Sequence, residues 1–215
     1  QKGHAYAQYN IGYMYRHGKG VTEDHEKALQ WWRKAAEQGM ALAQLNIAFM
    51  YYYGHSVTQD YKQALKWFEK GAVSNDVAQF MTGQMYHDGQ GVPQDYKQAV
   101  HWYKKAGEQG YVIAQYTLGK MYGGERIGKD YKQAAKWFEK AAEQGHGDAQ
   151  ARLGLIYYDG KGVIQNFKLA HMWFNIAASS GTLHADKLRD SMAKEMSQSQ
   201  LEKAQDMARE WVAKH

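Results

Sequence analysis

One tryptophan returns along this chain every 35 or 36 residues, and four other residue types keep the same spacing. Five matched series with a single period do not arise by chance, and a period of about 20 to 50 residues is typical of a repeat architecture. The recurring positions are Trp31, Trp67, Trp102, Trp137 and Trp173; Ala28, Ala64, Ala99, Ala134 and Ala170; Asp24, Asp60, Asp95, Asp130 and Asn166; Gln8, Gln44, Gln79, Gln115 and Gln150; and Tyr15, Tyr51, Tyr86, Tyr122 and Tyr157.

Each repeat begins with the pattern of an amphipathic helix. In the first repeat, Ala7, Ile11, Gly12 and Tyr15 fall on one helical face. Glycine or alanine takes the position of Gly12 in every repeat, although a mid-helix glycine costs about 1 kcal/mol in helix propensity. We therefore expect a neighbouring helix to approach closely at this position.

A glycine-containing turn and a second helix complete each repeat. The turn at residues 18–21 reads G-x-G-V, and two further turns share this form. The second helix begins at an aspartate such as Asp60, which can accept hydrogen bonds from backbone N–H groups. Gln63 follows at capping-box spacing, so its side chain can reach back to the cap. The apolar stripe that follows, which includes Trp67 and Phe68, predicts a buried face.

One such helical pair cannot bury its apolar face alone, whereas stacked pairs can, so the sequence predicts an all-α solenoid. We expect the five repeats at about residues 3–38, 39–74, 75–109, 110–144 and 145–181. Residues 183–193 then predict one more helix of the first type. Residues 197–214 predict an amphipathic helix, with Leu201, Ala204, Ala208 and Trp211 on one side. We expect residues 182–215 to cap the open end of the stack.

The order A-x-x-x-L-G-x-x-Y, then G-x-G-V, then D-Y-x-x-A-x-x-W resembles the Sel1-like repeat family, a relative of the tetratricopeptide repeats. The resemblance covers residues 3–181 and implies a right-handed α/α superhelix with a concave groove. It also implies an adaptor role, because family members act mainly in assembling protein complexes. Bacterial members are often exported, and some contact host proteins or cell-wall material, so the resemblance favours a periplasmic or secreted bacterial protein. The disulfide-linked branch of the family is not matched.

Composition excludes several kinds of site. Cysteine is absent, which excludes disulfides, thiolate metal sites and a cysteine nucleophile. The formal net charge of +5 is spread among acidic residues, so we expect no nucleic-acid partner. No apolar run approaches the roughly 20 residues of a membrane span, and no signal peptide is visible. We expect a monomer.

Enzyme motifs fail on inspection. Residues 12–19 and 154–161 resemble a P-loop, but five residues separate the glycines where four are needed. There is no H-E-x-x-H metal motif and no G-x-S-x-G nucleophile elbow. We therefore expect no catalytic residue, no metal, no cofactor and no enzymatic activity. We expect His101 and His171 to be solvated on the second helices.

The residues that differ between repeats are the candidates for recognition. On the first helices they form a second stripe, opposite the recurring one, which a groove adapted to a ligand would show. The candidate partner-binding residues are Tyr6, Asn10, Tyr13, His17, Asn46, Phe49, Tyr53, Met81, Gln84, Asp88, Thr117, Lys120, Arg152 and Leu155.

Aromatic residues favour a binding role for this stripe. Tyr6, Tyr13, Phe49, Tyr52 and Tyr53 do not belong to the recurring core, and aromatics with a polar group are typical interface anchors. An unconstrained surface would vary in the same way, and Tyr6 and Tyr52 could instead pack against a preceding repeat. The leading hypothesis is a scaffold that holds a partner protein or peptide. The alternative is a module that binds cell-wall glycan or peptidoglycan fragments, and a hydrolase is a third class.

Overall fold

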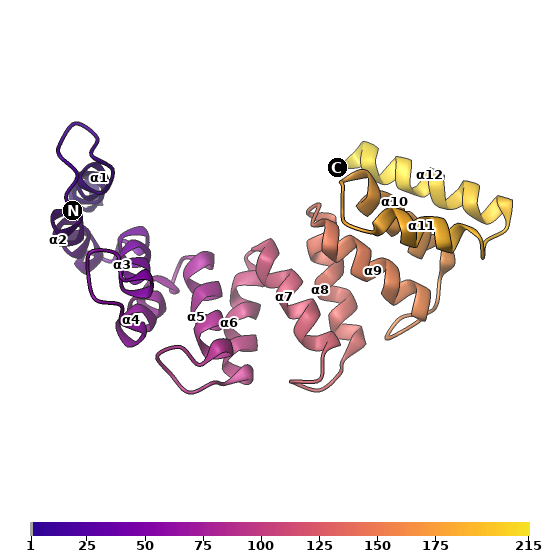
Figure 1. Ribbon diagram of the computed structural model, residues 1–215, viewed down its shortest axis with the longest axis horizontal. Helices are drawn as coiled ribbons and strands as arrows, with labels where there is room; N and C mark the ends of the chain where they lie inside the picture. The colour runs from indigo at the N-terminus through magenta and orange to yellow at the C-terminus, as the bar shows by residue number, and fades with distance from the viewer. Residues whose placement is uncertain (1) are drawn as a thin grey trace. The chain divides into compact units, whose positions relative to one another are not determined.

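The computed structural model describes residues 2–215, with side chains from residue 4 onward, and over that range it contains only helices and loops (Figure 1). The expected all-α repeat fold is therefore confirmed. The twelve helices of this range are α1 (Lys2–His17), α2 (His25–Glu37), α3 (Ala41–Tyr53), α4 (Tyr61–Gly71), α5 (Asp76–Asp88), α6 (Tyr96–Glu108), α7 (Val112–Gly123), α8 (Tyr131–Glu143), α9 (Gly147–Asp159), α10 (Phe167–Ser179), α11 (Ala185–Ala193) and α12 (Gln198–Lys214).

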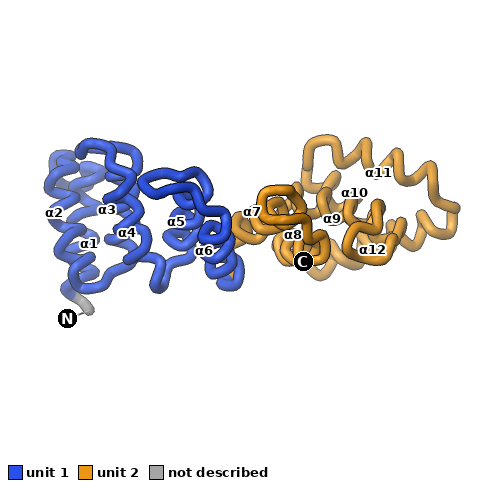
Figure 2. The backbone as a smooth tube through the Cα atoms, turned by 90° about the horizontal axis from the view of Figure 1, so that it is seen from below, with its two compact units in different colours: residues 1–109 blue, residues 110–215 orange. Residues whose placement is uncertain are grey.

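The chain divides into two compact units, an N-terminal unit of residues 1–109 and a C-terminal unit of residues 110–215 (Figure 2). Within each unit, every odd-numbered helix from α1 to α9 packs against the even-numbered helix that follows it. In the N-terminal unit α2 also packs against α3, and α4 packs against α5. In the C-terminal unit α8 packs against α9. Stacked helical hairpins therefore build both units.

In four of the five repeats a glycine in the first helix makes room for an aromatic ring of the second helix. A Cβ atom added to Gly119 would lie 2.5 Å from the ring of Phe138. At Gly154 the same atom would lie 2.6 Å from the ring of Phe174. These distances are far below van der Waals contact. The expected close approach is confirmed, and it explains why the position recurs.

The recurring glutamines, whose role the sequence did not show, join consecutive hairpins. All five are buried, and the side-chain amides of three of them donate a hydrogen bond to a carbonyl at the end of the preceding second helix. These bonds run from Gln44 to Ala36 at 3.1 Å, from Gln79 to Ala72 at 2.8 Å and from Gln150 to Ala142 at 3.1 Å. Buried backbone groups at helix ends need such partners.

The aspartate caps form as expected, because Asp60 and Asp130 each accept a hydrogen bond from the backbone three residues on at 3.0 Å. The reciprocal bond from a glutamine side chain does not accompany them. Among the hydrogen bonds of residues 4–215, the complete capping box occurs at Ser197 and Gln200, where α12 begins.

The aromatic that follows the recurring tryptophan is the more deeply buried of the two. Trp67 is only partly buried, whereas Phe68 is fully buried. The Lys70 ammonium lies over the Trp67 ring at 4.2 Å, as a cation–π contact on the outer side. Trp67 packs against two hydrophobic clusters of the N-terminal unit, so it joins two repeats. The expected full burial of the stripe is therefore corrected for Trp67, and Trp31 and Trp102 share its partial burial.

The last two helices pack against α10. Ala204 and Ala208 of α12 are buried, and the Trp211 ring meets the Trp173 ring edge-on at 5.7 Å between centroids. The apolar side of α12 therefore covers the last repeat. The preceding helix, α11, begins at Ala185 rather than at Leu183, whose side chain is exposed.

Candidate functional site: two grooves along the first helices

The first groove lies in the N-terminal unit, and we call it the aromatic groove. Its volume is about 330 Å³, and it lies along α1 and α3, with the buried Trp32 of α2 also lining it. Five candidate residues from the sequence line this groove, and α1 and α3 supply them all. They are Tyr13, His17, Asn46, Phe49 and Tyr53.

Ring contacts organise the aromatic groove. The Tyr13 and His17 rings lie 4.3 Å apart, one helical turn from each other on α1. On α3, Phe49 stacks with Tyr53 at 5.9 Å and meets the buried Phe68 edge-on at 5.2 Å. Phe49 is therefore partly buried, whereas Tyr53 keeps 55% of its surface exposed. The aromatic groove therefore combines the packed ring of Phe49 with the more exposed ring of Tyr53.

A polar chain holds one edge of the aromatic groove. Arg16, which lines the groove, lies 3.0 Å from Nε2 of His25 at the start of α2. Nδ1 of the same histidine lies 2.6 Å from the Ser56 hydroxyl in the turn after α3. Ser56 has a left-handed backbone with φ of 60°, at the position where the first turn has a glycine. The contact fixes the turn that carries His55, another groove residue.

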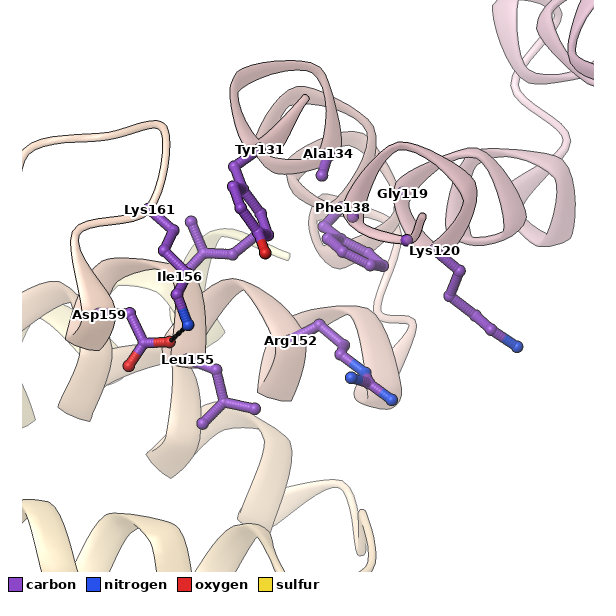
Figure 3. Close-up of a pocket in the computed structure, with 12 residues that line it drawn as sticks. Gly119, Lys120, Tyr131, Ala134, Phe138, Arg152, Leu155, Ile156, Asp159 and Lys161 are labelled. Carbon is purple, nitrogen blue, oxygen red and sulfur yellow. Dashed lines mark hydrogen bonds and ion pairs between the residues drawn. The ribbon is translucent and has the colours of Figure 1, made fainter. Parts of the chain in front are cut away.

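The second groove lies in the C-terminal unit, and we call it the basic groove (Figure 3). Its volume is about 350 Å³, and it lies along α7, α8 and α9. Lys120, Arg152 and Leu155 were candidates from the sequence and all line it. Phe138 and Ile156 add buried apolar surface.

One ion pair occupies part of the basic groove. The Lys161 ammonium lies 2.6 Å from a carboxylate oxygen of Asp159. The hydrogen bond and the nearby negative charge raise the pKa of Lys161 above its usual value, so its ammonium group stays charged at neutral pH. Figure 3 shows this pair on one side of Tyr131, with Lys120 and Arg152 on the other side.

Residues that line the two grooves come from equivalent positions of the repeat. Lys120 corresponds to Tyr13, one residue after the small residue of the first helix in each case. Arg152 corresponds to Asn46, and Leu155 corresponds to Phe49. At the buried position, Phe138 corresponds to Trp32. The same backbone thus presents different side chains.

The other six candidate residues line neither groove. Met81 was expected to lie on the stripe that a partner could contact, but it is buried in the hydrophobic cluster of the second and third repeats. Gln84 and Thr117 are partly buried, and Asp88 is exposed beside His87 at 2.7 Å. Tyr6 and Asn10 are exposed on α1.

Tyr52 is also a correction. It is partly buried, it meets the Tyr61 ring edge-on at 5.3 Å, and its hydroxyl donates to the Gln90 side chain at 3.0 Å. Its neighbours therefore come from its own repeat and the next one, and no preceding repeat is needed to explain it.

Sequence reasoning missed two residues that a simple rule could have found. His55 lines the aromatic groove and Lys161 lines the basic groove, both from the turn after the first helix. These two residues occupy the same variable place in their turns. Variation between repeats therefore indicates candidate residues in the turns as well as on the helices.

His171 overturns an expectation of the sequence. It is buried, with 2% of its surface exposed, and its Nδ1 atom has no hydrogen-bond partner in the described part of the chain. Burial lowers the pKa of His171, as does Arg189, while Asp190 acts in the opposite direction. Equivalent positions hold Leu29 and Leu65, so the residue lies on the apolar face and not on the solvated one.

Two other kinds of feature are absent from the described residues. Within residues 2–215 no cluster of three or more His, Cys, Asp or Glu side chains has the arrangement of a metal site. No helix in the same range combines the length and the apolar character of a membrane span.

Stacked hairpins with matched positions define an α-helical repeat protein of the solenoid type. The Sel1 repeat family model matches at residues 5–40, 41–74, 76–111, 112–146 and 147–182. The chain therefore belongs to the Sel1 repeat family. Repeats of this family commonly serve as protein–protein interaction modules, and the solenoid is a scaffold type of fold.

Solved structures agree with this family. A Sel1 repeat protein from Oxalobacter formigenes is 32% identical, with a TM-score of 0.74, over 96% of this chain and 87% of that one. A protective antigen with an SLR fold from uropathogenic Escherichia coli strains is 28% identical, with a TM-score of 0.54, over 97% of this chain and 61% of that one. The comparison with curated proteins found no match.

Proposed function

We propose that this protein is an interaction scaffold that holds a partner protein or peptide against the aromatic groove. The observation that carries the proposal is the grouping of Tyr13, His17, Asn46, Phe49 and Tyr53 around one groove of about 330 Å³. These residues vary between repeats, while the residues beneath them recur.

The chemistry of the groove suits a polypeptide. Tyr13 and Tyr53 expose 38% and 55% of their surfaces, although their rings contact neighbouring aromatic side chains. Rigid rings with a polar tip offer large contact area at small entropic cost, which is why tyrosine is enriched at interface hot spots. Asn46 adds an amide that can bind the backbone of an extended chain.

Family membership supports the same proposal. Sel1 repeats are commonly protein–protein interaction modules. A groove along the first helices would give such a module a recognition surface that is separate from its core. Stability and recognition would then depend on different residues of the same helices.

The test is a crosslinking pulldown from the source cells with the full chain as bait, in wild-type and variant forms. The double variant Tyr13→Ala with Tyr53→Ala is expected to reduce capture of the partner at least about tenfold, as loss of hot-spot residues does. Its melting temperature should stay within about 2 °C of wild type, because surface substitutions change stability little.

Tyr6→Ala is the matched control, because Tyr6 is an exposed tyrosine of α1 that lines neither groove. Capture should survive this change. Unchanged capture by the double variant, or loss of capture with Tyr6→Ala alone, would contradict the aromatic groove as the site.

The alternative ligand, a cell-wall glycan, is tested with the same variants. Aromatic faces beside an amide also suit sugars. If purified cell wall retains the wild-type protein and the double variant fails to bind it, while no protein is captured, the glycan function replaces the one proposed.

A further inference from the structure

The basic groove has unequal charge. Its lining includes three cationic side chains, Lys120, Arg152 and Lys161, and one carboxylate, Asp159. Asp159 is paired with Lys161 at 2.6 Å. Neither Lys120 nor Arg152 forms an ion pair with a carboxylate of residues 4–215. Asp148, one helical turn before Arg152, is not paired with it either. Two positive charges of the groove thus lack an anionic partner.

Apolar surface accompanies these charges. Phe138 and Ile156 are buried, and Leu155 is partly buried. Figure 3 shows Tyr131 pointing into the pocket from α8. The Lys120 ammonium lies 5.5 Å from the centre of the Tyr116 ring, which holds it on the α7 side. The groove can therefore take an apolar side chain and an anionic group together.

We propose that the basic groove binds an acidic peptide segment, with a carboxylate held by Lys120 and Arg152 and a neighbouring apolar side chain against Leu155. This inference rests on the proposed function, that the repeat stack binds protein, and adds a second groove with a partner of stated chemistry. Arginine and carboxylate form charge-assisted, often bidentate, hydrogen bonds. A phosphate backbone would need more cations than these two to bind tightly.

The geometry distinguishes the basic groove from the aromatic one. At the equivalent positions the aromatic groove has Tyr13 and Asn46, which are uncharged. Its cation, Arg16, lies at a different position of the repeat, with its guanidinium 3.0 Å from Nε2 of His25. An acidic segment therefore finds free positive charge in the C-terminal groove and not at the same places of the N-terminal groove.

The experiment measures fluorescence anisotropy of a fluorescein-labelled peptide in which glutamates flank a single leucine, titrated with the full chain. The same peptide with glutamine in place of glutamate is expected to bind at least about tenfold more weakly. The protein variant Lys120→Gln with Arg152→Gln should weaken binding of the acidic peptide by a similar factor. Added salt should weaken it further.

Two control variants make the result specific. Lys136→Gln removes an exposed positive charge of α8 that does not line the groove, and it should leave binding unchanged. Tyr13→Ala with Tyr53→Ala should also leave it unchanged. That second control separates the two proposals, because a failed pulldown through the aromatic groove would not alter this titration.

Three outcomes would overturn the inference. The first is binding of the acidic peptide that is absent at millimolar concentration or no tighter than that of the glutamine peptide. The second is equal binding by wild type and the Lys120 and Arg152 double variant, with circular dichroism showing that both are folded. The third is displacement of the peptide by a single-stranded oligonucleotide at equal concentration, which would show a general polyanion site.

Discussion

The aromatic groove and the basic groove occupy the same places of the repeat in two different units. At the position after the small residue of the first helix, one groove has Tyr13 and the other has Lys120. We call the exposed residues that line each groove its rim. Beneath the rim the two grooves are alike, because Trp32 and Phe138 are both aromatic, with 3% and 4% of their surfaces exposed. The rim residues of the two grooves therefore differ in charge and polarity, while a buried aromatic ring packs beneath both.

This contrast separates two demands on the sequence. Buried positions must fit the neighbouring helix, so an aromatic ring recurs at the position of Trp32 in every repeat. Rim positions contact solvent or a ligand, so charge and shape can change there at little cost to stability. Recognition can therefore differ between the two units without a change of fold.

The largest expected effect tests the buried aromatic residue beneath each groove. Trp32→Ala and Phe138→Ala should each lower the free energy of unfolding by about 3–5 kcal/mol, because each leaves a cavity in a close-packed interior. Denaturant titration measures the total loss, and hydrogen exchange locates it in the N-terminal or the C-terminal unit. Ile164→Ala, at a side chain that is 90% exposed, is the control. A small loss of unfolding free energy with either variant would show that the buried aromatics beneath the two grooves are not equivalent.

A smaller effect should separate the units by pH. The pKa of His171 lies below its usual value of 6.5 because the side chain is buried and Arg189 lies nearby. The unfolded chain therefore binds a proton more readily than the folded one, so stability is full above about pH 6.5 and falls as the pH drops through the folded pKa. Equivalent positions of the N-terminal unit hold the apolar residues Leu29, Leu65 and Val100.

Hydrogen exchange at about pH 7.5 and pH 5.5 measures this difference. Protection near α10 should fall in acid relative to the helices of the N-terminal unit. His171→Leu should reduce the acid loss, whereas His101→Leu, at an exposed histidine, should leave it unchanged. Equal acid sensitivity of wild type and His171→Leu would show that this histidine is not the cause.

Periodicity made most of the fold predictable. The recurring aspartates predicted where the second helices begin, and Gly119 and Gly154 predicted the close helix contacts. The pattern was less informative about depth of burial. Trp67 recurs because it joins two repeats, although it is only partly buried. Recurrence reports a constraint on a position, and burial is only one such constraint.

The candidate site was predictable in part. Variation between repeats found Tyr13, Phe49 and Arg152, which line the grooves. It also selected Met81, because a position that is exposed in one repeat can be buried in another when neighbouring side chains differ in size. His171 was misplaced by one residue in the repeat, and one residue turns a helix by about 100°.

The smallest expected effect concerns stability at the rims. Lys120→Gln, Arg152→Gln and Tyr53→Ala should each change the free energy of unfolding by no more than about 0.5 kcal/mol, because these side chains are exposed. Phe49→Ala is expected to cost more than these, since its ring contacts the buried Phe68 at 5.2 Å. Thermal denaturation ranks the four variants. A rim variant that destabilises the protein as much as Phe138→Ala would contradict the separation of rim and core.

Exchange of the rims tests the central claim most directly. Tyr13→Lys with Asn46→Arg gives the aromatic groove the two cations of the basic groove, and Lys120→Gln with Arg152→Gln in the same chain removes the original pair. The peptide with glutamates around leucine should then bind again, with most of the wild-type affinity, at the N-terminal unit. A folded variant that does not bind the acidic peptide would show that the rim residues do not decide what each groove recognises.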